Sequence, residues 1–559
     1  MKAATRTSFK FLLIIAGLGL ASVAGPAWSQ TQTASSPAAT PATAPAPHPL
    51  TNQNCESCHA PQRIPTVDPE MLAHSVHAKL NCTDCHSDIN NIPHPQQLQP
   101  VDCGGCHRKI VHELRLGPHA PGGKHVPTCA TCHGTHDIIK PGSEAFRNRI
   151  PVICGACHKE RFKAYMDVYH GQASILGVAN APRCSNCHNP HMPLPPDNPQ
   201  STIAPANLIT TCGACHKDIN KNFVQFDPHP QPDNRQHNAL VYFSKLFMEL
   251  LLAGVFGFFG LHTVLWLQRS LVERWRHEAE PEPPPSGRYV RRFTPYQSWL
   301  HVLVVVSFLG LAVTGLPLKY ASAHWAHVLY WLLGGEPIMR TVHIICAAIF
   351  FGYFIVHIVV VFILYSKSRD WRRFFWGVNS MVPRGQDIMD ILRNFRWFLY
   401  LGPKPKLDRW TYWEKFDYWA VFWGMFIIGL SGLMLRFPEF FSRVIPGEFL
   451  NVSLVIHGEE ALLAVGFIFV FHFFHNHFRP DKFPMDISIF TGRVPLERFK
   501  EERPAQYQRM VAEGKLDSMI VGPPSTFLKV VSTLFGASAI ILGLTLIISL
   551  FVTIIAAYT

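Results

Sequence analysis

In this 559-residue chain, cysteine is nearly absent from the C-terminal part, and long apolar runs are nearly absent from the N-terminal part. Only one of its 15 cysteines, Cys346, lies after residue 215, and the only long apolar run before about residue 240 is Phe11 to Val23. A composition so unevenly divided, on a chain of this length, excludes one uniform domain. The sequence also has no visible motif for a flavin, a molybdenum cofactor or an iron–sulfur cluster. Any chemistry that depends on those groups would therefore belong to another chain.

The N-terminal segment has the pattern of an exported protein. Three basic residues precede the apolar run, and Ala27-Trp28-Ser29 offers a cleavage site. This pattern predicts a signal peptide over residues 1–29. An uncleaved membrane anchor is the alternative, although the run is short for a full span. Residues 30–50 are rich in Pro, Ala and Thr and predict a disordered linker.

The other cysteines all belong to repeats of one motif, Cys-x-x-Cys-His. The seven copies are Cys55-Cys58-His59, Cys82-Cys85-His86, Cys103-Cys106-His107, Cys129-Cys132-His133, Cys154-Cys157-His158, Cys184-Cys187-His188 and Cys212-Cys215-His216. This spacing is typical of c-type haem attachment, in which two thiols bind covalently and the histidine is an axial ligand of the iron. Disulfides would not explain the histidines, and zinc would require four ligands at each site. We expect seven covalently bound haem c groups in an exported domain over residues 51–238.

About two dozen residues per haem are too few to build an ordinary hydrophobic core. The fold expected here is therefore a haem-packed domain of short helices and irregular chain, unfolded without its haems. Eleven further histidines could supply second axial ligands, which spacing alone does not assign. The eight favoured as ligands are His77, His94, His112, His119, His136, His170, His191 and His229. Iron with two imidazoles has no open position for a substrate, which argues against a terminal reductase.

The C-terminal part predicts an all-α transmembrane bundle over residues 239–559. Six apolar segments are long enough to span a bilayer: 241–267, 297–317, 341–365, 417–435, 449–475 and 527–557. The loops after the first, third and fifth segments are rich in Arg and Lys, whereas those after the second and fourth are not. The positive-inside rule then predicts a multi-pass protein of the bacterial inner membrane with the motif domain in the periplasm. The net charge of +12 follows from this topology and does not indicate nucleic-acid binding.

Histidines within the apolar segments are functional candidates, because ionisable groups are costly inside a membrane. His301 lies on the second segment, His343 and His357 on the third, and His457 and His472 on the fifth. The two pairs on one segment are separated by about 21 Å of helix rise, which suits two haems stacked across a bilayer. We expect two non-covalent b haems, with either His301 or His357 opposite His472.

The stretch Phe293-Thr-Pro-Tyr-Gln-Ser-Trp-Leu-His301, followed by Leu311-Ala-Val-Thr-Gly-Leu-Pro317, resembles the first helix of the cytochrome b subunits of formate dehydrogenase (its gamma subunit) and nickel-iron hydrogenase. The resemblance implies that His301 pairs with His472 and His343 with His457. The chain departs from the family in its additional His357, in the fifteen-residue spacing on the fifth segment and in an added first segment. The fusion of the two parts is similar to inner-membrane menaquinol oxidoreductases of metal-respiring bacteria.

These features predict a quinol oxidoreductase that passes electrons from menaquinol or ubiquinol through b and c haems to a periplasmic cytochrome or other redox acceptor. Glu459 and Glu460 are candidate acceptors of the quinol protons, but the resemblance favours a quinone site near the cytoplasmic haem. The alternatives are a non-catalytic electron-transfer or anchor subunit, and quinone reduction in the reverse direction. The expected surroundings are membrane lipid, without nucleic acid.

Overall fold

The computed structural model describes residues 50–59, 67–122, 126–276, 286–368 and 370–558. The predicted signal peptide and nearly all of the predicted linker lie outside the described residues. Two compact units are present: one includes residues up to 58 together with 81–99, and the other includes 59–80 and 100–559. The predicted boundary at residue 238 therefore does not separate these units, because residues 100–238 pack with the C-terminal helices.

The region with the Cys-x-x-Cys-His motifs contains short helices joined by irregular chain. They are α2 (Asn52–His59), α3 (Pro69–His74), α4 (Cys82–Cys85), η1 (Cys103–Gly105), α5 (Arg108–Arg115), α6 (Cys129–His133), α7 (Glu144–Gly155), α8 (Lys159–Met166), α9 (Tyr169–Ile175), α10 (Cys184–Cys187), α11 (Leu208–Gly213) and η2 (Phe223–Gln225). Helices α4, α6 and α10 coincide with motifs. Since residues three apart share one side of a helix, one turn brings both cysteines of a motif together.

The C-terminal part contains six helices long and apolar enough to cross a membrane, as the sequence predicted. They are α12 (Ala239–Trp275), α13 (Pro295–Lys319), α15 (Glu336–Ser368), α18 (Tyr412–Arg436), a fifth span over Glu448–Phe478 and α25 (Thr526–Tyr558). The fifth span consists of α20 (Glu448–Gly466) and the π-helical segments η3 (Phe467–His472) and η4 (Phe474–Phe478). The chain is therefore a multi-pass membrane protein.

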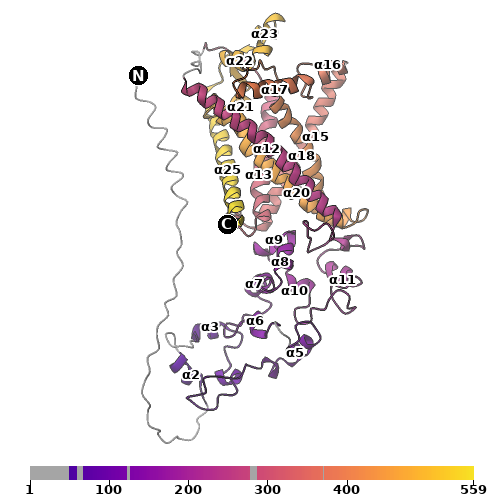
Figure 1. Cartoon of the computed structure of the whole chain (residues 1–559), viewed down its shortest axis with the longest axis vertical. Coiled ribbons are helices and arrows are strands. Elements are labelled where there is room, and N and C mark those ends of the chain that lie inside the picture. The colour runs from indigo at the N-terminus through magenta and orange to yellow at the C-terminus, as the bar shows by residue number, and fades with distance from the viewer. Residues whose placement is uncertain (1–49, 60–66, 123–125, 277–285, 369, 559) are drawn as a thin grey trace. The chain divides into compact units, whose positions relative to one another are not determined.

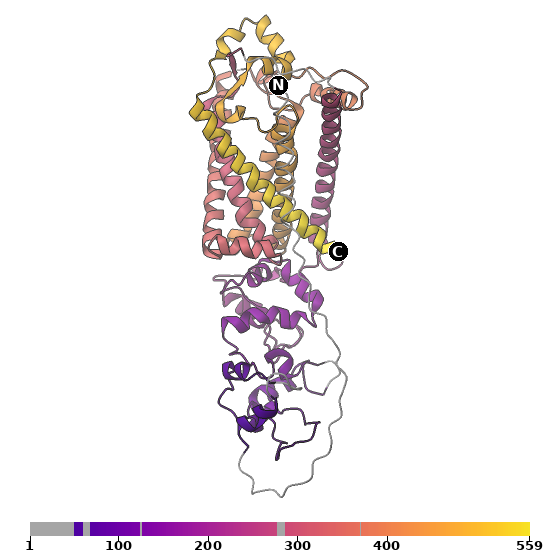
Figure 2. The same ribbon diagram turned by 90° about the vertical axis from the view of Figure 1, so that its left-hand side faces the viewer.

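The spans lie side by side in a bundle (Figures 1 and 2). Helix α13 packs against α15, while α12 and α18 both pack against α20. A core of mostly aromatic side chains joins α12, α18 and the fifth span. It includes the buried residues Phe259, Trp266, Trp413 and Phe471. A second core joins α13, the fifth span and α25 through Ala312, Phe469 and Leu550.

The three basic loops meet at one end of the bundle. Strand β1 (Tyr289–Arg291) pairs antiparallel with β2 (Arg493–Pro495) and β3 (Ile520–Val521), which joins the loop after the first span to the loop after the fifth. Short helices complete this end: α16 (Trp371–Trp376), α17 (Gly385–Phe398), α21 (Ser488–Thr491), α22 (Leu496–Glu502), α23 (Pro504–Ala512) and α24 (Leu516–Met519). We call this assembly the basic end.

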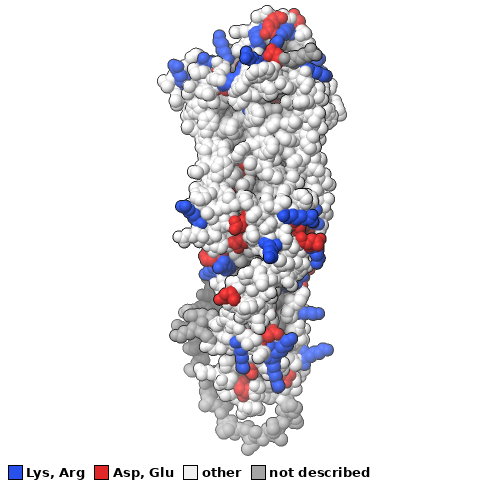
Figure 3. Space-filling model, turned by 90° about the vertical axis from the view of Figure 1, so that its right-hand side faces the viewer, with Lys and Arg blue, Asp and Glu red and all other residues white. Residues whose placement is uncertain are grey.

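The opposite end of the bundle includes α14 (His324–Leu332) and α19 (Pro438–Phe441), which lie in the loops after the second and fourth spans. Residues 216–227 bind to the α18–α20 connection, where Asn222 accepts a hydrogen bond from the Gly447 N–H at 2.8 Å. Over the spans the surface is nearly free of charged side chains, which gather beyond it on both sides (Figure 3). This is the surface expected of a protein whose spans face lipid.

Candidate functional site

Five motif histidines each face a second histidine from elsewhere in the chain. The ring-centroid separations are 6.0 Å for His107 and His77, 6.2 Å for His133 and His191, 6.2 Å for His158 and His119, 6.3 Å for His188 and His229, and 6.2 Å for His216 and His170. The five values fall within a narrow interval.

That interval is the one that haem iron requires. Two imidazoles that bind one metal ion from opposite sides, each through a bond of about 2 Å, place their ring centroids about 6 Å apart. Burial lowers the pKa of His170 to about 4 and lowers the pKa values of His133, His188 and His229 as well. These imidazoles are therefore neutral near pH 7, which is the form that binds a metal. The histidine pairs fit a haem with two axial imidazoles.

The cysteines of consecutive motifs also approach one another. The Cys184 thiol donates a hydrogen bond to Cys154, which lowers the pKa of Cys154 to about 7 and raises that of Cys184. In the smaller unit, Cys82 lies beside Cys55, and burial together with Cys55 raises the pKa of Cys82 to about 11. Haems attached through such neighbouring thiols would lie edge to edge.

Three predicted second ligands do not belong to these five pairs. His112 is exposed on α5. The Nδ1 atom of His94 lies 2.8 Å from the Pro95 carbonyl oxygen, and His136 is half-buried just beyond α6. Ligation by these three residues stays a prediction, as does the second ligand for the motifs that end at His59 and His86.

Four of the membrane histidines line one cavity in two groups. The rings of His301 on α13 and His472 on η3 have centroids 6.4 Å apart, which again matches two ligands of one iron. His343 on α15 and His457 on α20 line the same cavity. Beside these two rings lie Gly315 and Gly432, and added Cβ atoms there would come within 3.3 Å of His343 Cε1 and 3.0 Å of His457 Cε1.

Each of three membrane histidines has its Nδ1 atom held by a neighbour. The Nδ1 of His343 lies 2.9 Å from Thr314 Oγ1, and that of His457 lies 3.0 Å from the Ile428 carbonyl oxygen. The Nδ1 of His472 lies 2.9 Å from Asp417 Oδ2. Such contacts fix the ring and leave Nε2 for a metal. Sequence reasoning missed Asp417, although an acidic residue within an apolar span is itself a signal.

The fifteen-residue spacing between His457 and His472 has a structural explanation. In an α-helix with 3.6 residues per turn, residues fifteen apart are offset by about 60° around the helix axis. The π-helical hydrogen bonds over Phe467–His472 absorb the additional residue. As a result, both histidines of the fifth span face the cavity. Short π-helical segments within α-helices occur frequently at functional sites.

The structure does not bring His357 into either group of membrane histidines. Its Nε2 atom lies 3.0 Å from the Tyr418 hydroxyl, and its ring packs against Phe422. Of the two partners that the sequence allowed for His472, the geometry therefore favours His301. The side chain of His357 points toward Tyr418 and not toward His472. The depth of a residue in the membrane, which is what the sequence gives, does not specify this direction.

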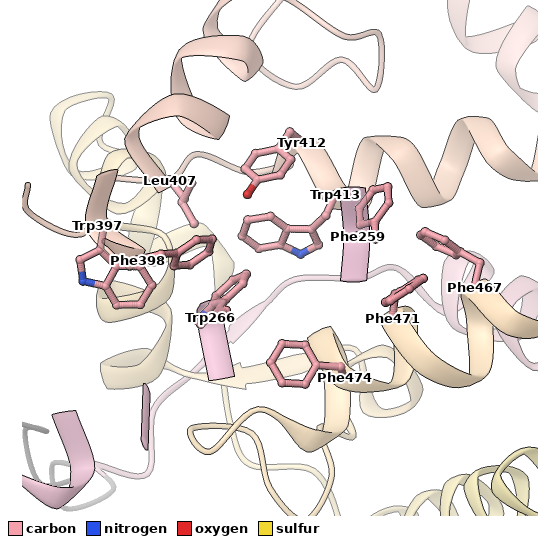
Figure 4. Close-up of a cluster of buried hydrophobic side chains, with 10 residues drawn as sticks. All are labelled: Phe259, Trp266, Trp397, Phe398, Leu407, Tyr412, Trp413, Phe467, Phe471 and Phe474. Carbon is pink, nitrogen blue, oxygen red and sulfur yellow. The ribbon is translucent and has the colours of Figure 1, made fainter. Parts of the chain in front are cut away.

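His262, on the added first span, serves the packing of the bundle. It is fully buried, and its Nε2 atom lies 2.5 Å from the Tyr412 hydroxyl. Its ring contacts Trp266, Phe398 and Trp413, which are drawn in Figure 4. Its Nδ1 atom lies 3.3 Å from His475 Nε2. Asn394 donates to the same Tyr412 hydroxyl at 2.8 Å. This network joins α12 to α17, α18 and η4.

A single cavity of about 3610 Å³ connects these sites in the larger unit. Its lining includes all ten histidines of the five c-type pairs together with His301, His343, His457 and His472. Comparison with protein-family models and with curated proteins found no match. The cavity thus brings the five c-type histidine pairs and the four membrane histidines to one continuous space.

The structure distinguishes the two candidate carboxylates on the fifth span. Glu459 forms an ion pair with Lys319 at 3.0 Å. Both line the cavity, but Glu460 is buried and accepts a hydrogen bond from Trp423 Nε1 at 3.2 Å. Within the described residues, no Lys or Arg forms an ion pair with Glu460. Of the two, Glu460 is therefore the better candidate for a group that takes up and releases protons.

Proposed function

We propose that this protein oxidises a membrane quinol and passes the electrons to a periplasmic acceptor through two b haems and seven c haems. The observation behind it is the continuous cavity lined by the five c-type histidine pairs, by the facing rings of His301 and His472, and by His343 and His457. Haem bound by two imidazoles exchanges single electrons and has no position for a substrate. The proposal places the motif region in the periplasm and the basic end in the cytoplasm.

The protein residues contribute binding, orientation and insulation. Motif cysteines would hold the c haems, and histidine pairs would hold the iron atoms. Side chains such as Thr314 and Asp417 orient the membrane histidines through Nδ1. The spans keep water away from the path between them. Oxidation of one quinol releases two electrons and two protons, so the quinol site must also lead protons to an aqueous side.

A groove of about 250 Å³ between α13 and α15 suits the quinol headgroup. Its lining is Tyr296, Trp299, Leu300, Leu303, Ile349, Tyr353 and Val356. Leu300 adjoins His301, and the exposed Trp299 and Val356 open the groove toward lipid. An apolar groove with a few polar groups is the usual form of a small-molecule site. Because Leu300 precedes His301 on α13, the groove lies at the depth of that histidine, which supports quinol oxidation near the basic end.

The experiment compares quinol oxidation in Val356→Trp and Ile355→Trp proteins. Val356 lines the groove, whereas the neighbouring Ile355 is exposed outside it. We expect Val356→Trp to raise the KM for a menaquinol analogue at least several-fold while both b haems are retained, and Ile355→Trp to leave it unchanged. Equal effects of the two substitutions would remove the groove from the proposal.

Glu460→Gln tests the alternative of oxidation near the other end of the bundle. If Glu460 accepts quinol protons, the variant will lose most of its rate while its haem spectra stay normal. If the groove is the site, the rate will be unchanged. Absence of any inhibitor-sensitive quinol oxidation in the wild-type protein would instead support a non-catalytic electron-transfer or anchor subunit.

A further inference from the structure

The histidine of the seventh motif has a carboxylate partner in the membrane domain. His216 Nδ1 lies 2.7 Å from Glu439 Oε1, although the two residues are 223 positions apart. Glu439 is on α19, in the connection between spans α18 and α20. His216 also faces His170 at a centroid separation of 6.2 Å. The contact through Nδ1 leaves Nε2 of His216 for iron.

Several further hydrogen bonds hold this contact in place. Asn220 and Asn222 donate from Nδ2 to the Ser442 carbonyl oxygen at 3.0 and 3.1 Å. Asn451 on α20 donates to the Asp227 carbonyl oxygen at 2.8 Å. Phe223 packs on the His216 ring, with centroids 4.9 Å apart. The position of Glu439 relative to His216 is thus set by the junction of two segments and not by one exposed ion pair.

His216 differs in this respect from the other histidines of the five c-type pairs. His229 Nδ1, for comparison, lies 3.1 Å from the backbone carbonyl oxygen of Arg161. Among the ten described histidines of these pairs, only His216 has a ring nitrogen in contact with a carboxylate. A carboxylate that accepts the Nδ1 proton increases the electron donation of an imidazole to its metal. That donation stabilises ferric over ferrous haem and lowers the reduction potential.

We propose that Glu439 is a positioning residue that lowers the reduction potential of the seventh c haem. This inference rests on the proposed function, because it requires haem at His216. The seventh motif is the one that meets the membrane domain, so its haem would receive electrons from the b haems. A potential below that of the neighbouring c haem directs each electron outward along the chain.

The test is a potentiometric titration of the purified full-length protein carrying Glu439→Gln. Glutamine keeps the shape and an acceptor oxygen but removes the negative charge. We expect one low-spin haem component to shift to higher potential while the total haem content is unchanged. The matched control is Glu448→Gln, which removes the same charge from an exposed residue in the same connection.

Two outcomes would overturn the inference. One is a titration curve of Glu439→Gln identical to that of the wild type, and the other is an equal shift in Glu448→Gln. A Cys212→Ala/Cys215→Ala protein, which lacks the seventh attachment site, provides a second measurement: the effect of Glu439→Gln should disappear in it. A haem content below seven c haems in the wild type would instead contradict the proposed function, so the two failures are distinguishable.

Discussion

The rings of His301 and His472 have centroids 6.4 Å apart, and the second ring is held by Asp417 at 2.9 Å. These three residues come from three different spans. One iron bound by both rings would therefore link α13 to the fifth span. Asp417 on α18 would fix the orientation of His472. This relationship has direct consequences for haem content.

Replacement of either ring should remove one b haem. We expect His301→Ala and His472→Ala each to halve the b-haem content, because one imidazole alone holds a non-covalent haem weakly. His357→Gln should retain both haems, because His357 contacts Tyr418 and neither histidine group. Pyridine haemochrome analysis measures the content. Loss of a b haem in His357→Gln, with normal content in His301→Ala, would reverse the assignment.

Asp417→Asn should weaken the same haem without removing its ligands. A partner that holds a metal-binding histidine through Nδ1 is typically worth about 10–100-fold in metal affinity. We therefore expect partial loss of one b haem and a higher reduction potential for the remainder. Redox titration monitored by the b-haem absorbance measures both. An unchanged content and potential would show that the contact has no role at the haem.

The small residues beside His343 and His457 should be required for the other b haem. Leucine at position 432 would place its side chain beside His457 Cε1, where the glycine leaves room for a porphyrin. Gly432→Leu should lose one b haem. Gly254→Leu, at a position on α12 with open space around the added Cβ, is the matched control. Equal haem contents in the two variants would contradict this reading of the cavity.

A fall in pH should destabilise the fold of the basic end before it destabilises the membrane spans. Lys482 and Arg498 lower the pKa of Glu502 from its ordinary 4.5 to about 2, and the same cations lower that of Asp486. A lowered carboxylate pKa stabilises the fold above the ordinary pKa, and this stability is lost as the pH falls from about 4.5 toward 2. Limited proteolysis of residues 479–525 between pH 7 and 3 measures the loss.

Glu502→Gln should make this region sensitive to protease already at pH 7. Removal of one partner of a buried ion pair costs about 3 kcal/mol or more. Glu513→Gln, at an exposed residue of the same region, should behave like the wild type. If cleavage of Glu502→Gln follows the wild-type dependence on pH, the ion-pair network does not stabilise this end.

The six spans could be predicted from sequence because each requires about twenty consecutive apolar residues. Their ends could not, since α12 continues to Trp275 and α15 to Ser368, beyond the apolar segments. The basic residues likewise predicted that the loops after the first, third and fifth spans lie on the same side of the membrane. Their pairing into one sheet through β1 depends on contacts between residues about 200 positions apart.

For the c-type motifs the candidate site was predictable to the level of residue type but not of partner, whereas the family resemblance already implied the pairing of His301 with His472 that the geometry favours. The seven motifs identify their own cysteines and histidines through spacing alone. The choice of His77 or His229 as a facing ring depends on how short helices fold back, which has no local signature. The π-helical turn before His472 and the approach of Glu439 to His216 are tertiary features of the same kind.

The central claim is that quinol electrons pass through b haems to c haems within this one chain. Its most direct test is redox-resolved spectroscopy of the purified protein after addition of a menaquinol analogue. We expect two b haems and seven c haems, all low-spin, with both types reduced and the reduction blocked by a quinone-site inhibitor. Quinol that leaves the haems oxidised, or b-haem reduction without any c-haem reduction, would contradict it.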